Sequence, residues 1–139
     1  MKLQRQTKFA GAEAPADERG DCFAACLASI TGVSVDAVPN FCAFDGAWMD
    51  RANAWLVERG LMLVTFEGDP FREMREYRQH AIMIASGPGP RGHRHCVLWR
   101  DGALFHDPHP SDDGLVGDPE EFEIVCLLDA DAFNRRSNT

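Results

Sequence analysis

The chain has 139 residues, of which 45% are hydrophobic and 26% are charged, and its formal net charge is −8. This length and balance are typical of one globular domain, here spanning residues 1–139, that can bury a core. The acidic charge argues against partners that need a basic surface, such as duplex DNA or an anionic membrane, and no apolar run approaches the roughly 20 residues that span a bilayer. Five cysteines, an odd number, and no apolar leader after Met1 predict a reduced, cytoplasmic protein.

The first half of the chain has the periodicity of helices. Apolar residues at i, i+3, i+4 and i+7 predict a helix that begins at Cys22 and ends before Gly32. A second helix is predicted to begin at Asp45 or Gly46 and to end at Gly60. This half is also expected to contain an extended segment over residues 3–9, a loop over 10–19, a capped turn over 34–39 and a strand over 61–66.

The second half has the pattern of short strands. Asp101-Gly102 is a strong hairpin signal between strands over residues 95–100 and 103–106. Before this hairpin we expect a short charged helix or irregular segment over residues 70–78, a buried strand over 80–85 and a Gly/Pro loop over 86–92. After it we expect a turn-rich segment over 108–119, a last strand over 123–128 and a fraying tail over 129–139. Helices first and antiparallel strands afterwards predict an α+β fold.

Cys22 occupies a position that suits a nucleophile. A polar loop ends at Asp21, and Cys22 then opens the first predicted helix. A thiol on the first turn of a helix lies near unsatisfied N–H groups and the positive end of the helix dipole. Both favour thiolate over thiol, so the pKa of such a cysteine can fall from roughly 8.5 by one or more units. This is how a cysteine nucleophile is prepared, provided that a histidine can reach it.

The predicted hairpin supplies a histidine and a carboxylate. His95 begins its first strand, and Asp107 follows the end of its second strand. Pairing about the two-residue turn sets Arg100 against Ala103 and, further back, His95 near Pro108. Asp107 is therefore expected beside His95, which is the proximity that a general base and its orienting group need.

These motifs resemble the papain-like cysteine peptidase superfamily. Within it, the chain is most similar to the peptidases that remove double-glycine leaders from bacteriocins, in which an Asp-Cys pair, a strand-borne His and a later Asp-Pro recur. The chain also resembles small phage and bacterial proteins that share Cys-x-x-x-Cys-x-Ala-Ser and His-Asp-Pro-His-Pro-Ser stretches, here residues 22–29 and 106–111. The resemblance implies a papain-like fold, with N-terminal helices packed on a small antiparallel sheet, and a phage-related thiol protease or amidase that needs no metal or cofactor.

The resemblance also implies a role for each matched residue. Cys22 corresponds to the nucleophile. His95 corresponds to the general base, which later protonates the leaving amine, and Asp107 to the residue that orients the imidazole and stabilises its charged form.

The oxyanion donor is the one departure from the family pattern. Papain-like enzymes place a Gln about six residues before the cysteine, and here that position is Ala16. Gln6 lies 16 residues before Cys22 and could serve if residues 10–19 are an inserted loop. Gln4 is a less attractive candidate. The backbone N–H of Cys22 would supply the second donor.

The other cysteines and His93 have structural interpretations. Cys26, Cys42, Cys96 and Cys126 lie in apolar surroundings and are expected in the core, and His93 is expected in solvent.

A zinc site built from two of the cysteines and two of the histidines is one rival, although the spacing of Cys22, Cys26, His93 and His95 does not match the usual structural sites. A papain-like domain that has lost turnover and binds a peptide or protein is another. The preferred interpretation is a Cys-His-Asp hydrolase of peptide, isopeptide or amide bonds in a peptide or protein substrate, with no nucleic acid or membrane as partner.

Overall fold

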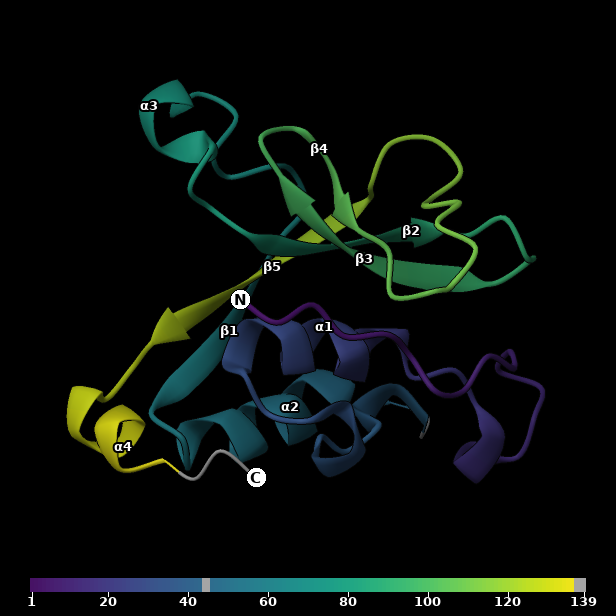
Figure 1. Ribbon diagram of the computed structural model, residues 1–139, viewed down its shortest axis with the longest axis horizontal. Helices are drawn as coiled ribbons and strands as arrows, with labels where there is room; N and C mark the ends of the chain where they lie inside the picture. Colours follow the sequence, from purple (N-terminus) through teal and green to yellow (C-terminus); the bar gives the residue numbers. More distant parts are fainter. Residues whose placement is uncertain (44–45, 137–139) are drawn as a thin grey trace.

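The computed structural model describes residues 1–43 and 46–136, where five strands form one antiparallel sheet in the order β1-β5-β2-β3-β4. The strands are β1 (Leu61–Phe66), β2 (Met83–Pro88), β3 (Arg94–Arg100), β4 (Ala103–His106) and β5 (Glu121–Leu127). The helices are α1 (Cys22–Thr31), α2 (Trp48–Val57), α3 (Arg75–Arg78) and α4 (Ala130–Arg135), with short 3-10 turns η1 (Ala16–Glu18), η2 (Val35–Ala37) and η3 (Phe41–Ala43). Helices α1 and α2 lie together beside the sheet (Figure 1), which confirms the α+β class.

Helix α1 is the central helix of the core. It begins at Cys22, as predicted, and ends at Thr31, where Gly32 adopts a left-handed conformation and donates its N–H to the carbonyl of Ala28. Nearly all of its side chains are buried, because α1 lies between the sheet and other chain segments. The Ala-rich sequence keeps the helix thin enough for this close packing on several sides.

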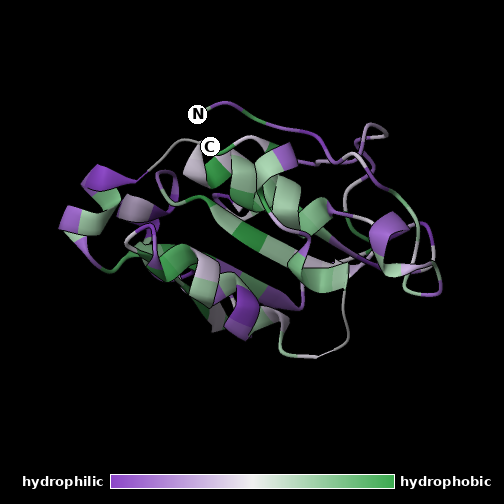
Figure 2. Ribbon diagram, turned by 90° about the horizontal axis from the view of Figure 1, so that it is seen from below, coloured by the Kyte–Doolittle hydropathy of each residue, from purple (hydrophilic) through white to green (hydrophobic). Residues whose placement is uncertain are grey.

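The sheet has two different faces, set by the alternation of side chains along each strand. One face carries Leu63, Ile84 and Leu98 into the main core with α1 and α2. The other carries a smaller cluster that includes Met83 and Phe122. Figure 2 shows hydrophobic segments gathered in the middle of the molecule and a largely hydrophilic N-terminal segment.

The β3–β4 hairpin forms at the predicted turn. Asp101 and Gly102 have φ angles of 53° and 73°, as a two-residue turn of this type requires, and Arg100 pairs with Ala103. A register shift beyond Trp99 then sets His106 opposite Leu98. Strand β4 therefore has one extra residue between the turn and His106, compared with regular pairing of the two strands. The ends of the hairpin that carry the histidine and the carboxylate still meet.

Two of the predicted loops contain regular structure. Strand β2 extends to Pro88, so the loop predicted over residues 86–92 is wrong in its first part; Ser86 pairs on both sides, with Cys96 and with Glu121. The fraying tail predicted over residues 129–139 is also wrong for residues 129–135, while residues 137–139 lie outside the described part of the chain. Asp129 accepts hydrogen bonds from two backbone N–H groups and caps α4, and Phe133 packs against the main core.

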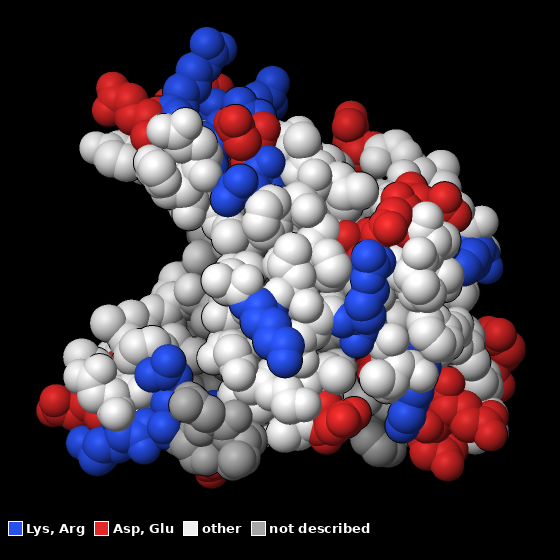
Figure 3. Space-filling view, in the orientation of Figure 1, with Lys and Arg blue, Asp and Glu red and all other residues white. Residues whose placement is uncertain are grey.

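Two further observations concern hydropathy and the distribution of charge. Within residues 1–43 and 46–136, no helix has the length and apolar character needed to cross a membrane. On the face in Figure 3, Lys and Arg side chains are interspersed with acidic ones, and acidic side chains gather at the end near η1, which carries Asp17 and Glu18.

Candidate active site

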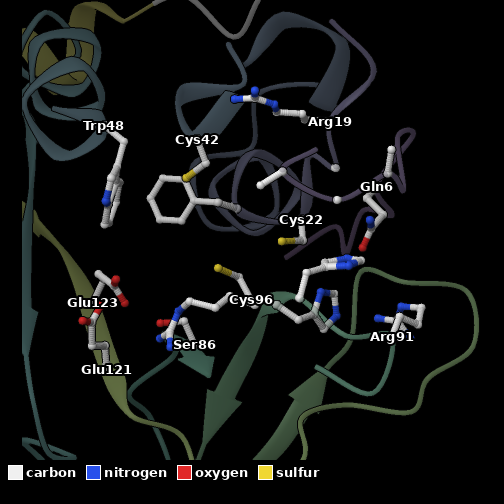
Figure 4. Close-up of a pocket in the computed structure, with 18 residues that line it drawn as sticks. Gln6, Arg19, Cys22, Cys42, Trp48, Ser86, Arg91, Cys96, Glu121 and Glu123 are labelled. Atoms are coloured by element: carbon white, nitrogen blue, oxygen red, sulfur yellow. The ribbon is translucent and has the colours of Figure 1, made fainter. Parts of the chain in front are cut away.

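A cleft of about 470 Å³ is lined by residues from the start of α1, the N-terminal segment and strands β2, β3 and β5. Cys22, His95 and Gln6 all line it, with Cys96 and Glu123. Figure 4 shows Cys22 and Cys96 in the middle of the cleft, Gln6 on one side and Glu123 on the other. The structure thus brings together residues that lie up to 117 positions apart in the sequence (123 − 6).

Cys22 is the first residue of α1 and is half-buried. Its pKa is well below the ordinary value of a thiol. The Cys96 thiol makes the largest contribution by hydrogen bonding to the Cys22 sulfur; the imidazole of His95 lowers the pKa further through a hydrogen bond and its charge, while burial opposes both. The helix start adds to the same effect. Cys22 is therefore prepared to react as a thiolate.

His95 and Asp107 form a buried pair. His95 Nε2 lies 2.6 Å from Asp107 Oδ1, and each residue is only 2% exposed. Burial opposes the charged imidazole, but interactions with Cys22 and then Asp107 raise the pKa of His95 above its ordinary value. Because Nε2 is held by the carboxylate, Nδ1 is the ring nitrogen left for the thiol. The geometry expected from the hairpin is present.

Asp107 is fixed by backbone groups as well as by the imidazole. Oδ1 also accepts a hydrogen bond from the N–H of His109 at 2.9 Å, and Oδ2 accepts one from the N–H of Gly114 at 2.8 Å. Burial raises the pKa of Asp107, but His95 and these two N–H groups outweigh it, so the pKa lies below its ordinary value. The carboxylate remains charged and cannot rotate freely.

Gln6 reaches the cleft because the N-terminal segment is hydrogen-bonded both to Pro108, which follows Asp107, and to Asp21, which precedes Cys22. The Gln6 N–H donates to the Pro108 carbonyl at 3.0 Å. The Asp21 carboxylate accepts hydrogen bonds from the N–H groups of Thr7 and Lys8 and from the Thr7 hydroxyl. Asp21 thus aligns the segment beside the start of α1, a role that the sequence did not indicate.

The loop after this segment leaves and returns at nearly the same point. Ala10 bridges Arg19, and the Gly20 N–H donates to the Ala10 carbonyl at 2.8 Å. The structure therefore has residues 10–19 as an excursion, the condition under which Gln6 was expected to serve. Gln4, by contrast, is held away from the cleft by hydrogen bonds to Val33 and Val35.

The amide of Gln6 is partly engaged. Its Nε2 donates to the Lys8 carbonyl at 2.8 Å, and its Oε1 is buried without a hydrogen-bond partner. An amide nitrogen carries two N–H groups, so one remains for an oxyanion. Gln6 therefore lines the same cleft as Cys22, with its carboxamide oriented by the hydrogen bond to the Lys8 carbonyl.

The other cysteines do not all lie in the core. Cys26 does, with 0% exposure, and the half-buried Cys96 packs against the main core while it also lines the cleft. Cys42 is exposed, so the prediction of a core position is wrong for Cys42. Although Cys42 is exposed as a residue, its thiol lies among the atoms that line the cleft, and the loss of hydration there raises its pKa to about 12. The interaction with Cys22, together with burial, raises the pKa of Cys96 well above its ordinary value. Cys126 is half-buried.

Two further histidines lie near the pair. His93 lines the cleft and is half-buried, so its expected position in solvent is only partly correct. The ring of His109 lies edge-on to that of His95, with centroids 6.3 Å apart, and edge-on to Phe9 at 5.3 Å. The His109 ring thus packs between the rings of His95 and Phe9.

Glu123 is a functional candidate that the sequence did not reveal. It is 2% exposed, lines the cleft, and its Oε2 has no hydrogen-bond partner. Burial, followed by repulsion from Glu121, raises its pKa to about 7, while Arg94 lowers it slightly. A buried carboxyl in this state is costly to the fold whenever it is charged.

That cost predicts a pH-dependent stability. The pKa of Glu123 is about 7 in the fold against an ordinary 4.5, so the folded protein holds this proton more tightly, and stability falls as pH rises through that window. Between about pH 5 and pH 8, wild type should lose about 2 kcal/mol of unfolding free energy relative to Glu123→Gln. Urea unfolding of both proteins at the two pH values measures this, with the exposed Glu67→Gln as control. Parallel pH dependence in all three proteins would contradict it.

The zinc interpretation receives no support from the geometry. Among residues 1–43 and 46–136, no three His, Cys, Asp or Glu side chains are grouped so that they could hold a metal ion. Cys26 in particular lies in the core cluster and not among the residues that line the cleft.

Comparison of the chain with family models, with curated proteins and with solved structures gives no match. The chemistry of the cleft therefore has to be argued from its own residues.

Proposed function

We propose that this protein is a papain-like cysteine peptidase or amidase that cleaves a peptide, isopeptide or amide bond with a Cys22-His95-Asp107 triad. One observation carries the proposal: His95, whose Nε2 lies 2.6 Å from the buried Asp107 carboxylate, lines the same cleft as Cys22, a thiol with a lowered pKa at a helix start. A blocked or misoriented histidine would have favoured a binding module instead.

The reaction begins with the thiolate of Cys22. It attacks the carbonyl carbon, the C–S bond forms, and the carbonyl electrons move to oxygen. His95, as imidazolium, donates its Nδ1 proton to the leaving amine while the C–N bond breaks, which leaves a thioester. Neutral His95 then takes a proton from water as the water oxygen attacks the thioester carbon. The C–S bond breaks to regenerate the Cys22 thiolate beside imidazolium, and the carboxylic acid product departs and gives its proton to solvent.

The oxyanion of each tetrahedral intermediate needs donors. The backbone N–H of Cys22 is one of the first N–H groups of α1, which have no partner within a helix, and Gln6 supplies the second donor. Loss of one such donor typically costs about 2.7–4 kcal/mol of transition-state stabilisation. The tie between Gln6 and the Lys8 carbonyl, at 2.8 Å, keeps the carboxamide in place for this role.

The reactivity of Cys22 tests the proposal without a known substrate. Limiting iodoacetamide at about pH 6, followed by peptide mapping, should modify Cys22 first, because its thiolate persists there. Cys26 is buried, and the pKa values of Cys42 and Cys96 are raised, so these thiols should lag. Cys22→Ser should lose the fast phase of alkylation, whereas Cys42→Ser, in the same cleft, should keep it.

Preferential labelling of a different cysteine, or uniform labelling of all five, would defeat the proposal. In that case the cleft would be better understood as a binding site for a peptide or a protein segment.

A further inference from the structure

The cleft is chemically asymmetric about the nucleophile. Figure 4 shows Glu121, Glu123 and Trp48 together at one end, Gln6 and Arg91 at the other, and Cys22 between them. A substrate that lies across Cys22 therefore meets carboxylates on one side of its scissile bond.

Strand register leads from the nucleophile to these carboxylates. Ser86 on β2 pairs with Cys96 on β3 and with Glu121 on β5, so their side chains share one face of the sheet. Cys96 contacts Cys22, and two strand spacings of ~4.8 Å separate it from Glu121. The acidic end is thus about 10 Å along the sheet from Cys96, the residue that contacts the reacting sulfur. One or two extended residues at ~3.3 Å each and a long side chain can span that distance.

Glu123 is the residue at this acidic end of the cleft whose carboxylate lacks a hydrogen-bond donor. It lies on the same face, opposite Ile84 and two residues along β5 from Glu121. Its side chain is 2% exposed and lines the cleft, yet Oε2 accepts no hydrogen bond within the described chain. A buried acceptor without a donor costs free energy, and a substrate that brings a donor recovers it.

The surroundings favour a cationic donor over a neutral one. Glu121 raises the pKa of Glu123 by repulsion. Arg94, which also lines the cleft and attracts Glu121, lowers that pKa, but its guanidinium is bound to the exposed Glu120. A cation placed between Glu121 and Glu123 would relieve their repulsion. Trp48 lines the same end of the cleft, and an aromatic ring attracts cations through its face.

We propose that Glu123, assisted by Glu121 and Trp48, is the subsite for a basic side chain, lysine or arginine, one or two residues from the scissile bond. This deepens the proposed function and rests on it. Binding replaces the proton on Glu123 with an ammonium or guanidinium group, whose N–H donors reach Oε2. Glu123 is thus a specificity-determining residue, since it contacts the substrate and takes no part in bond cleavage.

Paired irreversible probes test this subsite. Acetyl-dipeptidyl acyloxymethyl ketones alkylate a thiolate with loss of the acyloxy group as a carboxylate, and they place lysine or its uncharged isostere norleucine at either residue next to the reactive carbon. Wild type should react at Cys22 at least about tenfold faster with a lysine probe than with the matched norleucine probe at about pH 8. Glu123→Gln should reduce that ratio to near one, whereas Glu67→Gln, which removes an exposed carboxylate outside the cleft, should keep it.

A second measurement on wild type does not depend on the folding of Glu123→Gln. The lysine-to-norleucine rate ratio should rise as pH increases through about 7, because Glu123 ionises there, and the ratio cancels the ionisation of Cys22 itself. The groups that bear on Glu123 in this range are Glu121 and Arg94.

Failure of the subsite and failure of the enzyme are distinguishable. If iodoacetamide labels Cys22 first but the lysine and norleucine probes react equally, the subsite is wrong and the proposed function stands. If Glu123→Gln slows both probes to the same extent, Glu123 has only a structural role and the inference fails. If iodoacetamide shows no preference for Cys22, the proposed function fails, and the inference fails with it.

Discussion

Replacing His95 with alanine should abolish acyl transfer while leaving the fold intact. The substitution removes the base and the acid at once, and general acid–base catalysis alone is worth about 10²–10⁴-fold. It also removes the hydrogen bond and the charge that lower the pKa of Cys22. At about pH 6 the alkylation rate at Cys22 should therefore fall by at least about tenfold, because each pKa unit of increase reduces the thiolate fraction tenfold.

The measurement is the pH profile of alkylation over several pH values, with His93→Ala as the matched control. His93 lines the same cleft two positions earlier on the chain, but it does not contribute to the lowered pKa of Cys22. The helix start and the Cys96 thiol remain in His95→Ala, so the profile should move towards that of an ordinary thiol without reaching it. An unchanged profile in folded His95→Ala with a shifted one in His93→Ala would identify the other histidine as the base.

The parts of the site that follow from local sequence were predictable. The Asp101-Gly102 turn demands positive φ at both residues, and that alone brings the two arms of the hairpin together. His95 and Asp107 meet for this reason, even though a register shift beyond Trp99 alters which residues face each other. Because His95 and Asp107 are only 12 residues apart, one correctly predicted turn is enough to bring their side chains together.

The parts that depend on distant segments were not predictable in the same way. Gln6 reaches Cys22 only because the loop over residues 10–19 closes on itself and Asp21 fastens the N-terminal segment. No periodic pattern in the sequence encodes that closure. The position of Cys96 in the cleft likewise depends on where α1 begins above β3, since its apolar neighbours are those of a core residue.

Glu123 shows how a strand boundary can hide a site. The last strand was predicted to begin at Glu123, which would leave that carboxylate at an end in contact with water. The strand begins two residues earlier, at Glu121, so Glu123 lies within the sheet and its side chain is buried. Boundaries are the least certain part of any prediction from sequence. Here the shift turns an ordinary surface residue into an unpartnered acid in the cleft.

Asp107→Asn should lower the activity by about 10²–10⁴-fold without abolishing it. The oxygen of the new amide can take the place of Oδ1 and accept from His95 and His109, but its nitrogen then faces the Gly114 N–H, donor against donor. That conflict should cost about 1–3 kcal/mol of unfolding free energy. The carboxylate also helps to raise the pKa of His95, so its loss should move the basic limb of the pH–rate profile to lower pH.

Asp112→Asn is the matched control. Asp112 lies in the same loop and carries the same charge, but it pairs with Arg5 at 2.7 Å on the exposed surface. Its loss should leave the basic limb in place. Since the fold lowers the pKa of Asp107 below its ordinary 3.8, the stabilisation that Asp107 provides is present at neutral pH and is lost as pH falls through that region. The stability difference between wild type and Asp107→Asn should accordingly shrink in acid. If the variant kept the wild-type rate and basic limb, a charge on residue 107 would not support the imidazolium, and the triad would reduce to a Cys22–His95 dyad.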